Sequence, residues 1–301
     1  METNNQEKIN NQDKLEKLAK KNAMVFEGGG ILGASYTGAL VRLHELVGPL
    51  KVKNVAGSSV GSLIATALAC GANPYYIHQR MMELDLTKFK DGGCCLVQFF
   101  RLLFKYGSHK GDYIETFIGD TLQDLTQNRN ITFQEAYERF GCFLTITYLS
   151  TDQEQTIYAN HLNHPHHQIK TVARWSSSIP LFFQAPRQGT DLILDGAVLD
   201  SYPLHILRDI SEDKDIIGFK LYNDQEIKIP RIRNLKDYAF VMVNILREQA
   251  LRYHVEENDW KLTCRINVGK YKTTDFNITQ ADKEWLYNAG REGMDKFLKL
   301  I

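Results

Sequence analysis

Residues 23–61 read AMVFEGGGILGASYTGALVRLHELVGPLKVKNVAGSSVG, and the order of apolar runs and glycines in this stretch decides the fold class. A short apolar run ends abruptly at three glycines, which is typical of a strand that leads into a loop. Apolar residues at spacings of three and four then predict a helix over Ala34–Val47. Lys51–Ala56 predicts a second strand, and a glycine-serine turn leads into a second helix, Ser62–Cys70. This alternation of strands and helices predicts a parallel sheet covered by helices.

The rest of the chain continues the α/β pattern. Residues 75–140 are predicted to be mostly helical, which gives a helical insertion after the helix that follows Ser59. Further strands are predicted at 143–148, 156–159, 192–194, 216–221 and 264–268, and further helices at 15–21, 235–254 and 282–299. We therefore expect a polar N-terminal extension, 1–21, and one α/β domain, 22–301, with a mainly parallel central sheet flanked by helices.

Composition and charge exclude several protein classes. Lysine plus arginine and aspartate plus glutamate are both 36, so the chain lacks the basic excess typical of nucleic-acid-binding proteins. The five cysteines include an adjacent pair, Cys94 and Cys95, and an odd number favours a reducing compartment over a disulfide framework. The N-terminus has no apolar signal-peptide core, and no apolar run reaches the length of about 18 residues that spans a membrane. We expect an intracellular, cytoplasmic protein that contacts membranes only peripherally.

The sharpest motif is Gly57-x-Ser59-x-Gly61. A serine hydroxyl is a poor nucleophile unless a tight strand-to-helix turn presents it beside a base. The flanking glycines allow that turn and let the strand and the helix pass closely. The five-residue pattern is common by chance, but its place after an apolar strand and before a small-residue helix makes Ser59 a candidate nucleophile.

A second motif is the glycine loop Gly28-Gly29-Gly30-Ile31-Leu32-Gly33. Consecutive glycines that open a helix leave backbone N–H groups free to bind an oxyanion or a phosphate. The loop also satisfies the dinucleotide pattern G-x-G-x-x-G, which requires an acidic residue about twenty positions later, at the end of the next strand. Lys51–Ala56 carries no acid there and leads to Ser59 instead, so an oxyanion site is favoured over a nucleotide site.

A third motif, Asp195-Gly196-Ala197, follows the strand predicted at 192–194. A carboxylate at the end of an apolar strand can accept a hydrogen bond from a nearby hydroxyl group. Such a turn is commonplace by itself, so its meaning depends on the other two motifs. A carboxylate is normally ionised at neutral pH unless it is strongly desolvated, so no unusual tuning of the pKa of Asp195 is expected.

The three motifs, in this order and at these distances, resemble those of the patatin-like phospholipase family. Four further segments also resemble segments of the family, namely Gly111-Asp112-Tyr113, Ala173–Phe183, Thr274-Asp275-Phe276 and Leu286–Gly290. The resemblance covers about residues 22–300 and implies a patatin-like α/β fold. It also implies a two-residue catalytic machine that needs no cofactor and no metal ion.

Carried over to this chain, the resemblance implies that Ser59 is the acyl-accepting nucleophile and that Asp195 takes its proton directly. The backbone amides of Gly28, Gly29 and Gly30 would form the oxyanion hole. Many family members have lysine or arginine where this chain has Leu32, whereas some triglyceride lipases of the family are apolar there. The absence of a positive charge at Leu32 is expected to affect the preference for a phospholipid head group more than catalysis.

Histidines offer two alternatives. A hidden serine–acid–histidine triad could use His205 or His254, but folds with that triad usually carry a histidine before the oxyanion glycines, where Glu27 stands. A zinc site could form in the cluster His161, His164, His166 and His167, although no cysteine lies near and a polar surface loop explains the cluster as well.

Leu96–Tyr106, with the sequence LVQFFRLLFKY, is the best candidate for contact with a lipid surface. Extraction of an acyl chain from a bilayer costs about 0.8 kcal/mol per methylene, so a lipid hydrolase needs an apolar channel and a docking face. The segment is rich in leucine and phenylalanine and its only charges are cationic, which suits an anionic interface. The alternative is that this helix packs on the core.

We expect a lipid acyl hydrolase of the phospholipase A or lysophospholipase type that acts on glycerophospholipids, as implied by the resemblance. Some intracellular members of the family require a protein activator, so the resemblance leaves an activator open as a partner; no nucleic acid is expected. Two alternatives remain open: a catalytically dormant lipid- or partner-binding module, and, with less support, a nucleotide-binding enzyme.

Overall fold

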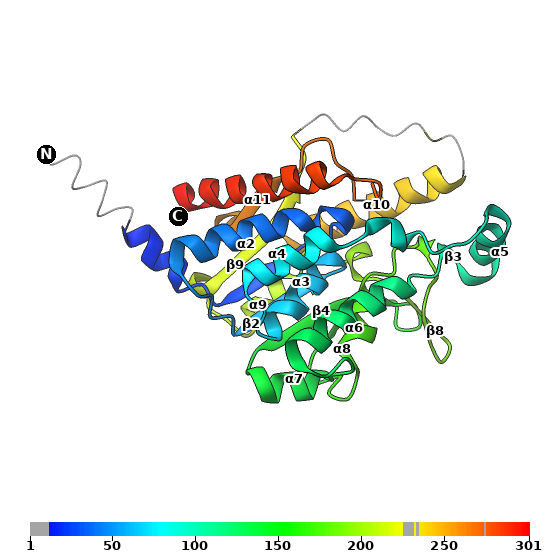
Figure 1. Cartoon of the computed structure of the whole chain (residues 1–301), viewed down its shortest axis with the longest axis horizontal. Helices are drawn as coiled ribbons and strands as arrows, with labels where there is room; N and C mark the ends of the chain where they lie inside the picture. The colour runs from blue at the N-terminus through cyan, green and yellow to red at the C-terminus, as the bar shows by residue number, and fades with distance from the viewer. Residues whose placement is uncertain (1–11, 225–231, 233–234, 274) are drawn as a thin grey trace, which may run out of the picture.

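The computed structural model describes residues 12–224, 232, 235–273 and 275–301. Residues 12–19 form a helix, close to the helix predicted at 15–21. The first eleven residues of the predicted N-terminal extension lie outside the described residues, and so does Thr274 of one predicted motif. In the described part of the chain, helices cover a central sheet (Figure 1).

The central sheet is mixed and mostly parallel. Its eight strands have the order β10-β9-β1-β2-β4-β8-β7, with β5 paired to β4. The first five strands of this order run parallel, whereas β5, β7 and β8 are antiparallel to their neighbours. The strands are β1 (Ala23–Phe26), β2 (Asn54–Ser58), β4 (Phe143–Ser150), β5 (Gln155–Ala159), β7 (Arg187–Gln188), β8 (Asp191–Asp195), β9 (Ile216–Tyr222) and β10 (Thr263–Asn267). The predicted α/β class with a mainly parallel sheet is confirmed.

Both faces of the sheet are buried, as the alternation of side chains in β1 shows. Met24 and Phe26 belong to the main apolar core, while Ala23 and Val25 belong to a second apolar cluster on the opposite face. The main core is covered by α2 (Ala34–Val47), α3 (Val60–Ala69) and α11 (Gln280–Leu300), and the second cluster by α9 (Leu204–Arg208) and α10 (Leu235–His254). Helix α11 lies alongside α2 (Figure 1).

The predicted helical insertion follows α3. It consists of α4 (Pro74–Glu83), α5 (Cys95–Lys105), the short strand β3 (Gly107–His109), α6 (Asp112–Thr126) and α7 (Phe133–Phe140). Later in the chain, α8 (Ile169–Ser176) packs on α6, and β6 (Leu181–Phe183) pairs in parallel with β3. Within the described ranges, no helix combines the length and the apolar character needed to cross a bilayer.

Several element boundaries differ from the predicted ones, and the largest shift concerns β2. The sequence predicted this strand at Lys51–Ala56, but sheet pairing starts where Asn54 lies opposite Ala23 of β1 and continues through Ser58. Lys51 and Lys53 are exposed ahead of the sheet. The shift matters because the glycine-serine turn is consequently the end of a buried strand rather than a separate loop.

Candidate active site

Ser59 occupies a sharp turn between β2, which ends at Ser58, and α3, which begins at Val60. Its backbone has φ 51° and ψ −126°, a conformation that residues with a side chain rarely adopt. The Ser59 N–H donates to Oγ of Ser176 at 2.8 Å, and Oγ of Ser62 donates to the Ser59 carbonyl at 2.6 Å. The surrounding structure therefore holds the serine in a strained turn of the kind that presents a nucleophile.

The two flanking glycines are needed for close packing. A Cβ atom on Gly57 would collide with the Gly61 carbonyl oxygen, and one on Gly61 would collide with the Phe26 carbonyl oxygen. Both atoms would lie far inside normal contact distance, so any side chain here would push α3 away from β1 and β2. This contact explains the spacing of the G-x-S-x-G motif.

Asp195 lies beside Ser59 although the two residues are far apart in sequence. Ser58 of β2 pairs with Thr147 of β4, and the next residue of β4, Tyr148, pairs with Asp195 of β8. This register brings the last residue of β8 next to the turn, where Ser59 Oγ donates to Asp195 Oδ2 at 2.8 Å. The other carboxylate oxygen, Oδ1, accepts from the Ala197 N–H at 2.8 Å, which fixes the carboxylate plane.

Burial changes the protonation chemistry of Asp195. The carboxylate is almost inaccessible to solvent, and desolvation raises its pKa to about 7, against the lowering effects of the Ser59 and Ala197 hydrogen bonds and of the Arg247 and Arg174 charges. The expectation of an untuned carboxylate is therefore wrong, because the sequence does not reveal how completely the residue is buried. A base with a pKa near 7 is well matched to proton transfer at neutral pH.

The three glycines of the loop have different roles. The Gly28 N–H donates to the Ser201 carbonyl at 2.9 Å, so this predicted oxyanion donor is already engaged. A Cβ on Gly28 would lie 2.7 Å from Cβ of Ala197, which explains why both motifs need small residues where they meet. The N–H groups of Gly29 and Gly30 have no hydrogen-bond partner among the described residues, and Gly30 has a left-handed φ of 53°.

A buried ion pair, which sequence reasoning missed, anchors the glycine loop. Glu27 directly precedes the loop and accepts from Lys220 Nζ at 2.5 Å and from the Leu221 N–H at 2.9 Å, both on β9. The Ser201 hydroxyl donates to the same carboxylate at 3.4 Å. The signal in the sequence was a lysine inside the apolar strand at 216–221, since buried lysines are almost always paired.

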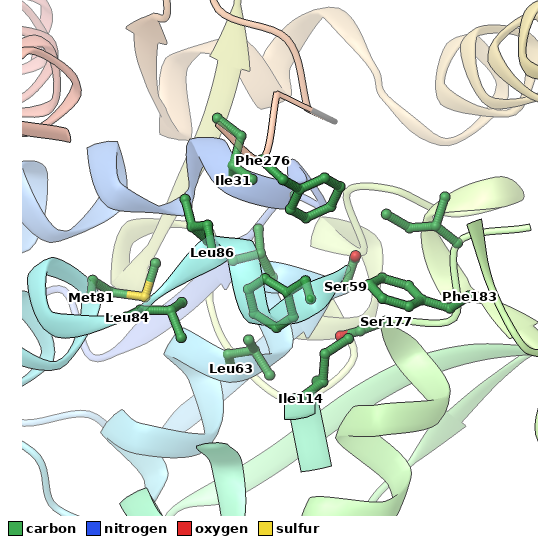
Figure 2. Close-up of a pocket in the computed structure, with 14 residues that line it drawn as sticks. Ile31, Ser59, Leu63, Met81, Leu84, Leu86, Ile114, Ser177, Phe183 and Phe276 are labelled. Carbon is green, nitrogen blue, oxygen red and sulfur yellow. The ribbon is translucent and has the colours of Figure 1, made fainter. Parts of the chain in front are cut away.

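Two pockets meet at Ser59. The apolar pocket has about 450 Å³ of space, including the part open to solvent, and no ionisable side chain among the described residues that line it. Figure 2 shows the Ser59 hydroxyl among its walls, which include Ile31, Leu63, Met81, Leu86, Phe183 and Phe276. A second pocket, here called the charged pocket, is also lined by Ser59 and includes Asp195, the glycine loop and, from α10, Asn244 and Arg247.

Ser177 and Ile179 of the predicted segment Ala173–Phe183 also line the apolar pocket, and Ser176 of that segment supports Ser59. Leu32 is buried in the main core and is not among the residues that line either pocket. The cation among the described residues that line the charged pocket is instead Arg247. The sequence could not place this arginine, because nothing in α10 marks the face that turns toward the glycine loop.

The histidines of the two alternatives lie in other clusters. His205 stacks on His254, and its Nδ1 lies 3.8 Å from Asp200 Oδ2, while Ser59 Oγ donates to Asp195. His161 stacks on Tyr137, and Nε2 of His164 lies 3.0 Å from the Tyr148 hydroxyl. In the described ranges, no three His, Cys, Asp or Glu side chains come together as a metal site would require.

Two proteins are similar in sequence to this chain over more than half of its length. An uncharacterized protein of Bacillus subtilis, YqhO, is 26% identical over 305 residues, which covers 91% of this chain and 97% of YqhO. The triacylglycerol lipase ptl3 of Schizosaccharomyces pombe is 28% identical over 189 residues, which covers 59% of this chain and 37% of the lipase.

Among solved structures, VipD of Legionella pneumophila has a similar fold, with a TM-score of 0.67 at 16% identity. The similarity covers 93% of this chain and 67% of the VipD chain. The family model for patatin-like phospholipase matches residues 24–208, a range that contains the glycine loop, Ser59 and Asp195. The chain therefore belongs to the patatin-like phospholipase family, and this membership supports lipid hydrolase activity.

Proposed function

We propose that the protein is a serine acyl hydrolase of the phospholipase A or lysophospholipase type, with Ser59 as nucleophile and Asp195 as proton acceptor. The observation that carries the proposal is the 2.8 Å hydrogen bond from Ser59 Oγ to Asp195 Oδ2 inside a pocket. A second observation supports it: the strained backbone of Ser59 is held by the buried hydrogen bond from its N–H to Ser176 Oγ. Such strain is found where a side chain must be presented for chemistry.

In the proposed reaction, the Ser59 proton moves to Asp195 Oδ2 as Oγ attacks the ester carbonyl carbon. The negative charge that develops on the carbonyl oxygen is stabilised by the N–H groups of Gly29 and Gly30, and each such donor is worth about a hundred- to a thousandfold in rate. The alcohol leaves with the proton held by Asp195. Water then attacks the acyl-serine and gives a proton to Asp195, which returns that proton to Ser59 Oγ as the bond between Oγ and the acyl carbon breaks and the fatty acid is released.

The apolar pocket supports a long acyl chain as part of the substrate, because its lining shelters methylene groups from water. Glycerophospholipid is the proposed substrate class. Neutral lipid is the second candidate, since the Schizosaccharomyces pombe relative is named a triacylglycerol lipase.

We also propose that the domain extends to the end of α11, whose Arg291 forms a two-oxygen ion pair with Glu45 of α2 at 2.7 Å.

Helix α5 is the proposed site of peripheral membrane contact. Phe100 is 50% exposed and Phe104 69% exposed, and none of the residues of α5 is buried, so the alternative that this helix packs on the core is wrong. The exposed Lys105 adds positive charge, and residues 96–110 contain no acidic residue. An apolar, cationic helix suits an anionic lipid surface. The helix packs on β3, which pairs with β6, so it lies near the pocket wall at Phe183.

The function is tested with a short-chain ester and with dispersed phospholipid. Wild-type protein is expected to hydrolyse both, and Ser59→Ala neither. Release of fatty acid by wild type, followed by mass spectrometry, supports the proposal. Absence of turnover on every ester, with or without lipid vesicles, would contradict it and would favour a dormant binding module.

Membrane contact is tested by sedimentation with vesicles that contain an anionic phospholipid. Phe100→Ser with Phe104→Ser is expected to reduce binding to vesicles while hydrolysis of a soluble ester is retained. Leu162→Ser removes an equally exposed apolar side chain outside α5 and serves as the control. Equal binding by all three proteins would contradict the assignment of α5.

A further inference from the structure

The two pockets beside Ser59 differ in charge. Gly30, Ser59 and Ile179 line both of them, so an ester bond at Ser59 would lie where the pockets meet. The apolar pocket offers no ionisable group among its described lining residues, whereas the charged pocket contains Arg247 as its one cation among those residues. A substrate with an apolar tail and an anionic head would match both sides.

Arg247 is held at the wall of the charged pocket with little to neutralise it. Its side chain is 27% exposed, and its Nε is buried without a hydrogen-bond partner in the described part of the chain. Its guanidinium lies 3.6 Å from the carboxylate of Glu248, its neighbour in α10. At 3.6 Å this contact is longer than a hydrogen bond, so it leaves the guanidinium able to bind another anion.

Asp195 does not take up that capacity. Its Oδ2 accepts from Ser59 and its Oδ1 from Ala197, and among the described residues the ion pair of Arg247 is with Glu248 and not with Asp195. An anion that binds Arg247 must also lie away from Asp195, because two like charges repel. This condition places the anion toward α10, where Asn244 adds two amide donors to the wall of the pocket.

We propose that Arg247 binds the phosphate group of a glycerophospholipid, with its acyl chain in the apolar pocket and its ester at Ser59. This inference rests on the proposed function, and it names the head-group side of the same site. Arginine suits the role because its planar guanidinium binds two phosphate oxygens at once, and such charge-assisted bonds are stronger than hydrogen bonds between neutral groups. A neutral glyceride offers no such anion and gains nothing from Arg247.

The first test compares two substrates with the same acyl chain, a lysophospholipid and a monoacylglycerol, in wild type, Arg247→Gln and Arg247→Lys. Assays at about pH 9 keep Asp195 ionised, since Arg247 also lowers the pKa of Asp195. Arg247→Gln is expected to lower kcat/KM for the lysophospholipid at least about tenfold more than for the monoacylglycerol, and Arg247→Lys to restore part of the loss. Arg252→Gln, an exposed arginine of the same helix, is the control and is expected to change neither rate.

The second test needs no turnover and therefore separates this proposal from the proposed function. Binding of dodecylphosphocholine and of an uncharged dodecyl glycoside, both as monomers, is measured on Ser59→Ala with and without Arg247→Gln. The phosphocholine is expected to bind more tightly than the glycoside, and Arg247→Gln is expected to remove that difference. Inorganic phosphate alone is expected to bind far more weakly, because it lacks the alkyl chain. Equal effects of Arg247→Gln on both ligands, or on both substrates, would overturn the proposal.

Discussion

Asp195 and Asp200 are two buried carboxylates five positions apart, and they have different surroundings. Only 3% of Asp195 and 1% of Asp200 is exposed, and burial raises the pKa of both. Asp195 accepts from the Ser59 hydroxyl and lines a pocket, whereas Asp200 accepts from the Tyr158 hydroxyl at 2.9 Å and is not among the residues that line the two pockets at Ser59. Burial and a raised pKa therefore do not identify a catalytic base by themselves. A carboxylate is identified as a candidate base by its contact with a nucleophile and by its position in a pocket that substrate can enter.

The largest effect is expected from removal of the dyad. Ser59→Ala and Asp195→Asn are each expected to lower kcat/KM for a short-chain ester by about a thousandfold or more, because nucleophile and base act as a unit. Asp200→Asn is expected to lower it less than about tenfold, since Asp200 touches no reacting atom. Kinetics are measured with circular dichroism as a check of folding. Similar losses in Asp195→Asn and Asp200→Asn would contradict the conclusion that Asp195 alone of the two carboxylates acts on the substrate.

The pH dependence of wild type should follow ionisation of Asp195. Because the base must be unprotonated and its pKa is about 7, kcat/KM is expected to fall about tenfold per pH unit below that value and to level off above it. The profile is measured with a neutral ester whose own ionisation cannot contribute. A profile that stays flat down to about pH 5 would mean that Asp195 has an ordinary pKa and is not desolvated as the structure indicates.

Replacement of Asp195 is expected to raise thermal stability at high pH, although it lowers activity. The pKa of Asp195 is raised from 3.8 to about 7 on folding, so the stabilisation it contributes is complete below about pH 4 and is lost as pH rises through 7. Replacement by a neutral amide removes a cost on the order of 4 kcal/mol at pH 8. Asp195→Asn is therefore expected to unfold several degrees higher than wild type at pH 8, and the gain is expected to shrink toward pH 5. Thermal midpoints that do not differ, or a gain independent of pH, would contradict this explanation.

The smallest effect is expected from the histidines beside Asp200. His205→Gln and His254→Gln are each expected to retain kcat/KM within about threefold of wild type and to leave the midpoint of the pH profile unchanged. A histidine base would titrate in the same pH range as Asp195, so these variants decide which group the profile reports. A loss of activity as large as that of Ser59→Ala would support the serine–acid–histidine triad instead of the Ser59–Asp195 pair.

Much of the fold and of the candidate site could be predicted from the sequence. Local patterns marked the strand-turn-helix at Ser59, the glycine loop and the strand end at Asp195, because tight turns and close backbone contacts demand particular small residues. The hydrogen bond between Ser59 and Asp195 joins two such local features, so their distance in sequence did not hide it.

The remaining features depend on tertiary contacts that no local pattern encodes. Three features follow from how distant elements pack. These are the hydrogen bond from the Gly28 N–H to Ser201, the raised pKa of Asp195, and the position of Arg247 of α10 in the wall of the charged pocket. Helix α5 is a further feature that the sequence alone did not determine. Its amphipathic sequence is equally consistent with a buried and an exposed face, and only the structure shows that its apolar side chains face outward.

The central claim, that Ser59 is a nucleophile activated by Asp195, is tested most directly by intact mass after reaction with a fluorophosphonate. Wild type and Asp200→Asn are expected to gain one adduct, which peptide mapping places on Ser59. Ser59→Ala is expected to gain none, and Asp195→Asn to react far more slowly than wild type. An adduct on Ser59→Ala, or equal labelling rates in wild type and Asp195→Asn, would contradict the account.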